Sequence, residues 1–236
     1  MDDLERYSDY NDYGDEEPRG KSKLGLILKI IAGIVIFSVV ALVGARIFLF
    51  NYYPSSVKNL YFNETLTAFY NEKDGEIAAK TQSLRAEYDN PDEGNFFADN
   101  LIVIHDANQL QVALRYNTSL MDSIKTKYGV ELDPDNPDNF EFSLAVIPFS
   151  KNDGSAYKTG SGGYVKFEKV MMYRYYKLVF DDVDFFIPGE SEIWIRLEIT
   201  IKGVEMKEPY MVLVYEDTET AKFKDYKLSN KEKPNG

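Results

Sequence analysis

The chain contains few arrangements of residues that are typical of acid–base or nucleophilic catalysis. Its single histidine, His105, precedes Asp106 at the end of a predicted strand, and cysteine is absent. A Ser–His–Asp arrangement would also need a serine on a sharp turn, and the sequence has no G-x-S-x-G motif. One histidine without cysteine also argues against the usual zinc sites. We therefore predict no catalytic residue, no metal site and no cofactor.

Two clusters of acidic residues are the remaining candidates for chemistry. Asp181, Asp182 and Asp184 follow a predicted strand, and a pair of carboxylates can hydrolyse glycosides. The loop 131–138 is rich in carboxylate and amide oxygens, the ligands that calcium prefers, but its spacing does not fit the helix–loop–helix calcium motif. We interpret both clusters as turn residues, with a hydrolase at 181–184 and a calcium site at 131–138 as alternatives.

Aromatic residues offer a candidate binding surface. Trp194 falls on the outward side of a strand that alternates in polarity, where the core does not require an indole ring. Tyr173 and Tyr175 belong to a predicted strand that we expect to lie nearby. Exposed aromatic rings on a sheet can stack on sugars or anchor a protein partner. The alternative is that a helix covers this face and makes Trp194 an ordinary packing residue.

One apolar stretch, 24–50, determines where these residues would lie. Its uninterrupted core, 30–45, reaches about 24 Å as a helix and the full stretch about 40 Å, against a hydrocarbon core of about 30 Å. Lys29 and Arg46 stand at its edges, where long side chains can reach the headgroups. We predict a single transmembrane helix, with Tyr52 and Tyr53 as aromatic residues at its outer interface.

The flanking charges predict the orientation of this helix. Basic residues crowd its N-terminal side (Arg19, Lys21, Lys23, Lys29), whereas after Arg46 the next basic residue is Lys58. The N-terminus is therefore expected in the cytoplasm and the remainder outside it. The alternative is a signal peptide cleaved after Ala45. The first 23 residues are acidic and poor in aliphatic side chains, so we predict a disordered tail in which Tyr7, Tyr10 and Tyr13 are a candidate phosphorylation segment.

Composition limits the partners of the exported part. The chain carries 39 acidic and 27 basic residues, and most of the excess follows residue 50. A negative surface repels nucleic acid, so we expect no nucleic-acid partner. Without cysteine, an exported domain has no disulfide and must rely on its core for stability.

The exported part begins with a predicted helix and continues as strands. A helix is expected over 55–72 within a juxtamembrane segment, 51–75, and a short helix over 118–127. Strands are expected at 101–106, 110–116, 140–149, 164–170, 173–181, 193–201 and 210–215. The strand 193–201 alternates apolar and polar residues at every position, which is typical of a sheet with one wet face. Residues 160–163 (GSGG) are expected to form a flexible hairpin loop, and the lysine-rich end, 221–236, a solvated tail.

Taken together, these elements predict a mainly β protein. A single transmembrane helix would precede an antiparallel β-sandwich over 76–220, with one or two accessory helices. The strand number and spacing resemble immunoglobulin-like modules, although the Cys…Trp…Cys signature of that family is missing. The stretches FFADNLIVIHDANQLQVALRYN, MYRYYKLVFDDVDF and EPYMVLVYED also resemble uncharacterised single-pass membrane proteins of Gram-positive anaerobes. The immunoglobulin-like resemblance implies an architecture but specifies no activity, and the second group brings no known function to this chain.

The function predicted from these observations is binding, without catalysis. We expect a domain anchored in the cell membrane and presented outside the cytoplasm, whose partner is another envelope protein. The second hypothesis is a glycan-binding module that uses Trp194, Tyr173 and Tyr175. A carboxylate-dependent hydrolase is the third.

Overall fold

A computed structural model describes residues 23–82, 96–148, 157–186, 193–217, 222–229 and 232–234. The chain divides into two compact units, Met1–Tyr52 and Tyr53–Gly236. In the first, helix α1 (Lys23–Asn51) contains the apolar stretch predicted at 24–50. Its segment Lys23–Phe48 is long and apolar enough to cross a membrane. The acidic tail, including Tyr7, Tyr10 and Tyr13, lies outside the described residues.

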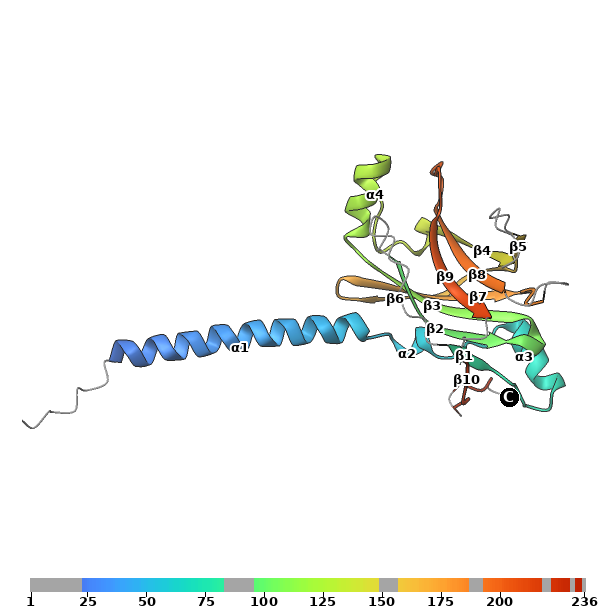
Figure 1. Ribbon diagram of the computed structural model, residues 1–236, viewed down its shortest axis with the longest axis horizontal. Coiled ribbons are helices and arrows are strands. Elements are labelled where there is room, and N and C mark those ends of the chain that lie inside the picture. The colour runs from blue at the N-terminus through green and yellow to red at the C-terminus, as the bar shows by residue number, and fades with distance from the viewer. Residues whose placement is uncertain are drawn as a thin grey trace, which may run out of the picture. The chain divides into compact units, whose positions relative to one another are not determined.

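The second unit, which we call the domain, contains two antiparallel sheets (Figure 1). Six strands follow the order β10-β1-β2-β3-β7-β6, and four follow the order β5-β4-β8-β9. The strands are β1 (Lys80–Gln82), β2 (Phe96–Ile104), β3 (Gln109–Asn117), β4 (Phe140–Pro148), β5 (Tyr157–Thr159), β6 (Ser161–Val170), β7 (Tyr173–Asp181), β8 (Ile193–Ile201), β9 (Tyr210–Asp217) and β10 (Lys224–Asp225). The predicted strands are thus present: β3, β6 and β9 extend beyond the predicted bounds, β7 and β8 match them, and β2 begins earlier and ends before His105.

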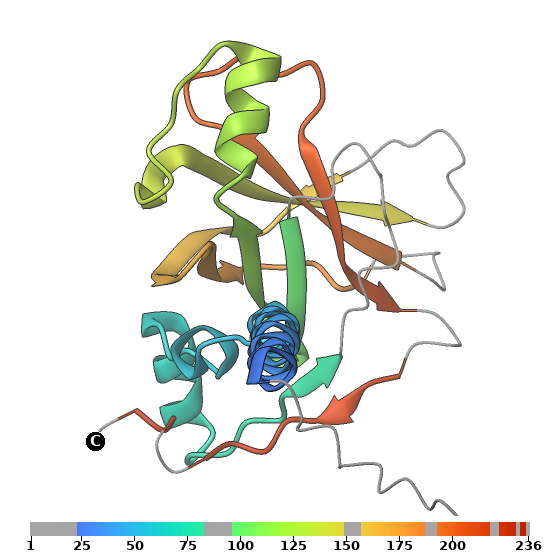
Figure 2. The same cartoon turned by 90° about the vertical axis from the view of Figure 1, so that its left-hand side faces the viewer.

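The inner faces of the two sheets enclose one core. Val112 and Leu178 come from the six-stranded sheet, and Leu144 and Leu197 from the four-stranded sheet; all four are fully buried. Helix α4 (Leu120–Tyr128) adds three buried residues to the same core, at the connection between β3 and β4 (Figure 2). This packing confirms a mainly β domain of two antiparallel sheets with few helices.

Strand β8 behaves as its sequence predicts. Its five isoleucine and leucine side chains point into the core, and the four between them are half-buried on the other face. It forms a hairpin with β9, as expected. The period-two pattern was sufficient here because alternate side chains of a strand point to opposite faces.

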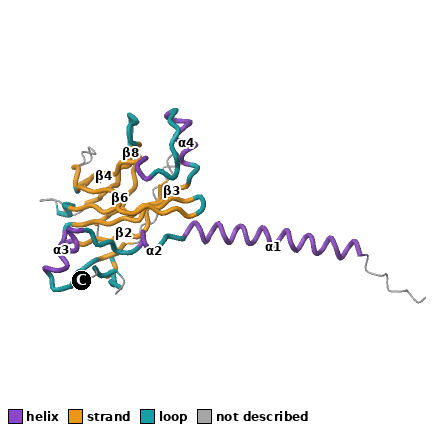
Figure 3. The backbone as a smooth tube through the Cα atoms, turned by 180° about the vertical axis from the view of Figure 1, so that it is seen from behind, coloured by secondary structure: helices purple, strands orange, loops and turns teal. Residues whose placement is uncertain are grey.

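The same reasoning is incomplete for β3, where Gln111, Ala113 and Arg115 alternate with apolar residues. Both faces of β3 are buried. The polar face is covered by residues 53–63, which we call the strap, and helix α3 (Glu64–Glu72) follows the strap and packs on Ile102 and Ile104 of β2. Figure 3 shows α2 (Ser55–Lys58) and α3 on the same side of the sheet.

The single helix predicted over 55–72 is wrong, since α2 and α3 are separate helices. Between them the backbone bonds to the sheet and the C-terminal segment. The Leu60 amide donates to Tyr226 Oη and to Glu232 Oε1, and the Tyr61 amide donates to Gln111 Oε1 at 2.9 Å. These tertiary bonds replace the bonds that a continuous helix would make. The Asn63 side chain then accepts a bond from the Leu66 amide and caps α3.

Residues 160–163 do not form the hairpin loop that their glycines suggest. Gly162 and Gly163 lie in β6, where they pair with Phe180 and Val179. A side chain at Gly162 would collide with the Val179 carbonyl oxygen, so this glycine allows close approach of two strands. Gly160, with φ of 76°, is the residue at which the chain passes from the four-stranded to the six-stranded sheet.

The lysine-rich C-terminal segment is partly built into the domain. Strand β10 pairs with β1 at the edge of the six-stranded sheet. Beyond it, Tyr226 and Leu228 pack with Leu66 of α3 and Ile102 of β2 in a second, smaller core. The described part of this segment is therefore not a solvated tail, because its apolar side chains pack on a surface that the strap and α3 form.

Candidate functional site

Trp194 lies on the outer face of the four-stranded sheet, as predicted. This face also carries Glu141 and Ser143 of β4, Arg196, Glu198 and Thr200 of β8, and Met211 of β9. The buried side chains of α3 and α4 point into the two cores, and α2 packs on β3, β6 and β7. Helices α2, α3 and α4 thus bury their apolar side chains elsewhere.

Tyr173 and Tyr175 do not lie beside Trp194. They belong to β7 of the six-stranded sheet, are almost completely buried, and face the strap. The expectation that β7 and β8 are neighbours is contradicted by the strand order, in which β7 pairs with β3 and β6. The three predicted site residues are therefore divided between the outer faces of two different sheets.

The buried tyrosines instead form part of an aromatic cage around Arg115. The guanidinium carbon lies 5.1 Å from the ring centre of Tyr53, 5.2 Å from that of Phe97 and 5.1 Å from that of Tyr173. Cation–π attraction is strongest when the cation is shielded from water, as it is here. Burial raises the pKa of Tyr53, whose hydroxyl donates to the Phe97 carbonyl at 3.1 Å. The Arg115 cage fixes the start of the strap to β2, β3 and β7.

A hydrogen-bonded network fixes the other end of the strap. Gln111 Nε2 donates to the Tyr61 carbonyl and to Gln109 Oε1, both at 2.7 Å. Gln109 Nε2 donates to Asn63 Oδ1 at 3.0 Å and to Asp181 Oδ1 at 2.7 Å, while Asn63 Nδ2 donates to Asp181 Oδ2 at 2.8 Å. Buried polar groups are stable only when they are bonded in this way.

Lys177 lies on the same face of β7, beside Ala113 of β3, and is completely buried. Within the described part of the chain, its ammonium nitrogen has no hydrogen-bond partner. Burial lowers the pKa of Lys177 to about 7, against a weak opposing attraction from Glu232. A buried amine with a pKa near neutrality can exchange protons at physiological pH. The strap covers Lys177, so a substrate could reach its ammonium group only by displacing the strap.

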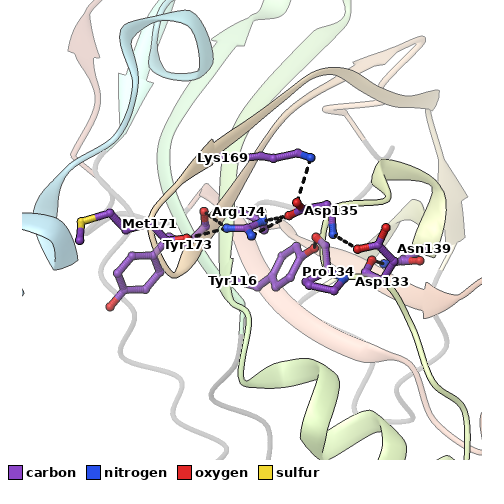
Figure 4. A network of polar contacts seen from close by, with 9 residues as sticks. All are labelled: Tyr116, Asp133, Pro134, Asp135, Asn139, Lys169, Met171, Tyr173 and Arg174. Atoms are coloured by element: carbon purple, nitrogen blue, oxygen red, sulfur yellow. Dashed lines mark hydrogen bonds and ion pairs between the residues drawn. The ribbon is translucent and has the colours of Figure 1, made fainter.

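The acidic loop 131–138 is held by protein donors rather than arranged around an ion (Figure 4). The Asp135 carboxylate pairs with Arg174 at 2.6 Å and with Lys169 at 3.2 Å, and bonds from these two side chains lower its pKa. Asp138 accepts a bond from the Tyr164 hydroxyl at 2.7 Å. Among the residues that the structure describes, no group of three or more potential ligands is placed to hold a metal ion.

The other chemical candidates also have structural roles. His105 packs its ring 4.9 Å from that of Phe185, and its Nε2 lies 3.4 Å from the Tyr215 hydroxyl. Asp181 belongs to the strap network, and Asp184 Oδ1 accepts a bond from the Phe186 amide at 3.1 Å. These contacts give each side chain a role in packing or in a turn.

Sequence reasoning did not find the Arg115 cage, the strap network or the burial of Lys177. Gln111 and Arg115 occupy the positions of a wet face in the pattern of β3. The sequence carries only one signal for this burial. The polar residues on β3 and β7 together are more numerous than a single contact at the edge of a sheet would require. The strap that covers them comes from a distant part of the chain.

Comparisons with models of protein families, with curated proteins and with solved structures find no match to this chain. The geometry of the domain is therefore the basis for any functional proposal.

Proposed function

We propose that this chain is a membrane-anchored binding domain without catalytic activity, presented outside the cytoplasm to another protein of the cell envelope. The apolar helix α1 precedes the β-rich domain and supplies the anchor. The basic residues before it favour a cytoplasmic N-terminus, since cytoplasmic flanks are rich in lysine and arginine. The N-terminal anchor would then keep the domain at the outer surface of the membrane.

The strand order supports an immunoglobulin-like arrangement of this domain. If β2 to β9 are lettered A, B, C, C′, D, E, F and G, the sheets read A-B-E-D and C′-C-F-G. That is the order of immunoglobulin domains with strand C′ added. The chain departs from the family by having α4 between B and C, β1 and β10 beyond A, and its tryptophan on strand F. Such a scaffold serves binding in many proteins, but its fold alone specifies no ligand.

The observation that carries the binding proposal is the outer face of the four-stranded sheet. It combines the half-buried Trp194 with Arg196, Glu198 and the exposed Met211. Tryptophan, arginine and methionine are enriched at protein interfaces, where a few such residues supply most of the affinity. Across this face the charges have both signs, which favours a protein partner over a uniformly charged polymer.

Glycan binding remains the second hypothesis, with a smaller platform than the sequence suggested. Tyr173 and Tyr175 are buried in the domain, so Trp194 is the one member of the predicted trio on this face. Substitution of Trp194 by alanine should abolish retention on envelope glycans if this hypothesis holds, and should leave such retention unchanged if the partner is a protein.

The protein-partner proposal can be tested by photo-cross-linking in intact cells. A photoreactive amino acid would replace Met211 on the outer face, and in a second variant Lys125 on α4. We expect Met211 to capture one envelope protein that Lys125 does not, and Trp194→Ala to abolish this capture without lowering the melting temperature by more than a few degrees. Equal capture from both positions, or capture by residues 1–54 alone, would contradict the proposal.

A further inference from the structure

The turn between β6 and β7 exposes two adjacent apolar side chains. Met171 is 71% exposed and Met172 is 41% exposed. Met171 adopts a left-handed backbone conformation, with φ of 51°, which glycine or asparagine would adopt at lower cost. The turn thus carries a methionine where its backbone would favour a residue with little apolar surface.

The structure holds this turn rigidly and directs its apolar side chains outward. Arg174 Nη1 donates to the Met171 carbonyl at 2.8 Å and to the Tyr173 carbonyl at 3.0 Å. The Thr118 amide donates to the Met172 carbonyl at 2.9 Å. Figure 4 shows the Met171 side chain pointing away from Arg174 and from the loop around Asp135. The backbone is therefore bonded into the domain, while the thioether is left at the surface.

The turn lies at the end of the domain where the strap begins. Tyr53 contacts the ring of Tyr175, and its own ring and that of Tyr173 flank the guanidinium of Arg115. Ser56 donates to Glu168 of β6 at 3.0 Å. The first residues of the strap thus contact both strands of the β6–β7 hairpin, close to its turn.

The chain itself limits how far Tyr53 can lie from a membrane that α1 spans. The 29 residues of α1 extend about 43 Å, similar to the 40–45 Å of a bilayer with its headgroups. Tyr53 follows the last residue of α1 by two positions, a reach of about 7 Å. If α1 spans a membrane, the chain therefore holds Tyr53 near the outer headgroups, and the turn belongs to the same end of the domain as Tyr53.

We propose that Met171 and Met172 insert into the outer headgroup region of the bilayer and give the domain a second contact with the membrane. This inference rests on the proposed function, because it requires α1 to be an uncleaved membrane anchor. Together the two contacts would restrict the orientation of the domain and keep the outer face of the four-stranded sheet available to a partner.

The charges around the turn indicate that the contact is apolar rather than electrostatic. The basic side chains that flank the turn in the sequence, Lys169 and Arg174, are both paired with Asp135. A contact driven by burial of apolar surface depends little on salt or on lipid charge. We therefore expect insertion into vesicles of neutral phosphatidylcholine, with no requirement for anionic lipid.

The proposal can be tested with full-length protein in such vesicles. Since the chain has no cysteine, a single cysteine carries an environment-sensitive fluorophore at one chosen site. Met171→Cys places the label on the turn. Asp106→Cys places a matched label on an exposed residue at the opposite end of the six-stranded sheet, and Phe37→Cys places one in the middle of α1.

A nitroxide quencher attached near the lipid headgroups should remove most of the emission of the label at 171 and leave the label at 106 unchanged. Added salt should not alter this result. If the label at 171 is shielded from dissolved iodide but unaffected by the lipid-borne quencher, a protein covers the turn and the proposal is wrong. It is also wrong if the labels at 171 and 106 respond alike.

The label at 37 separates failure of this proposal from failure of the anchor. Quenching at 37 by a nitroxide deep in the bilayer, without quenching at 171, would reject the second contact alone. A label at 37 that remains in water would reject the anchor as well. As a further check, Met171→Asn suits the left-handed backbone and should preserve folding, and it should reduce quenching of a label at Met172→Cys.

Discussion

Lys177 is an unusual residue for the interior of a small domain. Its ammonium group is buried on β7 under the strap, and burial lowers its pKa to about 7. An unfolded lysine has a pKa near 10.4, so between these values the unfolded state binds more protons than the folded state. The contribution of Lys177 to the free energy of unfolding must therefore rise with pH over this window, and it is least favourable below about pH 7.

We expect Lys177→Met to stabilise the domain most at low pH. The advantage of the variant should shrink by about 2–3 kcal/mol between roughly pH 6 and pH 9.5, as the wild-type lysine loses its proton in the folded state. Denaturant unfolding of both proteins at the two pH values would measure this. Lys166→Met, at the exposed position paired with Lys177 in the sheet, is the control and should show no such change. An equal effect of Lys177→Met at both pH values would contradict the expectation.

Gly162 illustrates a second constraint at the scale of single atoms. A Cβ atom at this position would lie 2.1 Å from the Val179 carbonyl oxygen, whereas at Gly163 it would meet no atom within 4 Å. Gly162→Ala should lower the free energy of unfolding by about 3 kcal/mol, and Gly163→Ala should change it by less than about 0.5 kcal/mol. Thermal and denaturant unfolding of the two variants would test this difference. Similar stabilities of the two variants would mean that β6 can shift away from β7.

At the scale of elements, the strap determines the character of the six-stranded sheet. It converts the polar face of β3 and β7 into an interior in which Gln109, Gln111 and Arg115 all have partners. Asn63 has a double role, because it caps α3 and bonds to Asp181, which lies far away in the sequence.

Loss of the Asn63 side chain should therefore cost more than loss of an ordinary helix cap. We expect Asn63→Ala to lower the free energy of unfolding by about 2–3 kcal/mol, the sum of a lost cap and a lost bond to a carboxylate. Asn59→Ala, at the end of α2, should cost less than about 0.5 kcal/mol. Equal losses for the two variants, measured by denaturant unfolding, would show that the network contributes little.

At the scale of the whole molecule, the orientation of the chain is the property on which the proposed function depends. A single cysteine at Ser8 should stay unlabelled when intact cells are treated with a membrane-impermeant maleimide, whereas Asp106→Cys should be labelled. Cleavage after Ala45 would instead give a shorter protein on a denaturing gel, and the cysteine at Ser8 would be missing from it even when the cells are lysed before labelling. Labelling of Ser8 but not of Asp106 would reverse the predicted topology.

Much of the fold could be predicted because it depends on local patterns. The apolar stretch in α1 and the strict alternation in β8 can each be recognised from the residues of that segment alone. The candidate site could be predicted only in part. Trp194 was placed on the outward face of its own strand, but Tyr173 and Tyr175 were placed near it, and the pairing of β7 with β3 moves them to another sheet. Pairing partners depend on the three-dimensional path of the chain, which periodicity does not reveal.

The sequence by itself determined a long apolar helix followed by a disulfide-free domain of antiparallel strands, because hydrophobic periodicity and composition act within short segments. Only the tertiary structure decided which polar side chains are exposed to solvent. Gln111 is buried and bonds to Tyr61, which lies 50 residues away in the sequence, whereas the half-buried Asp181 bonds to Asn63 at a separation of 118 residues. Whether a polar face meets water or another segment is settled by contacts between distant parts of the chain, and these form only when the whole domain folds.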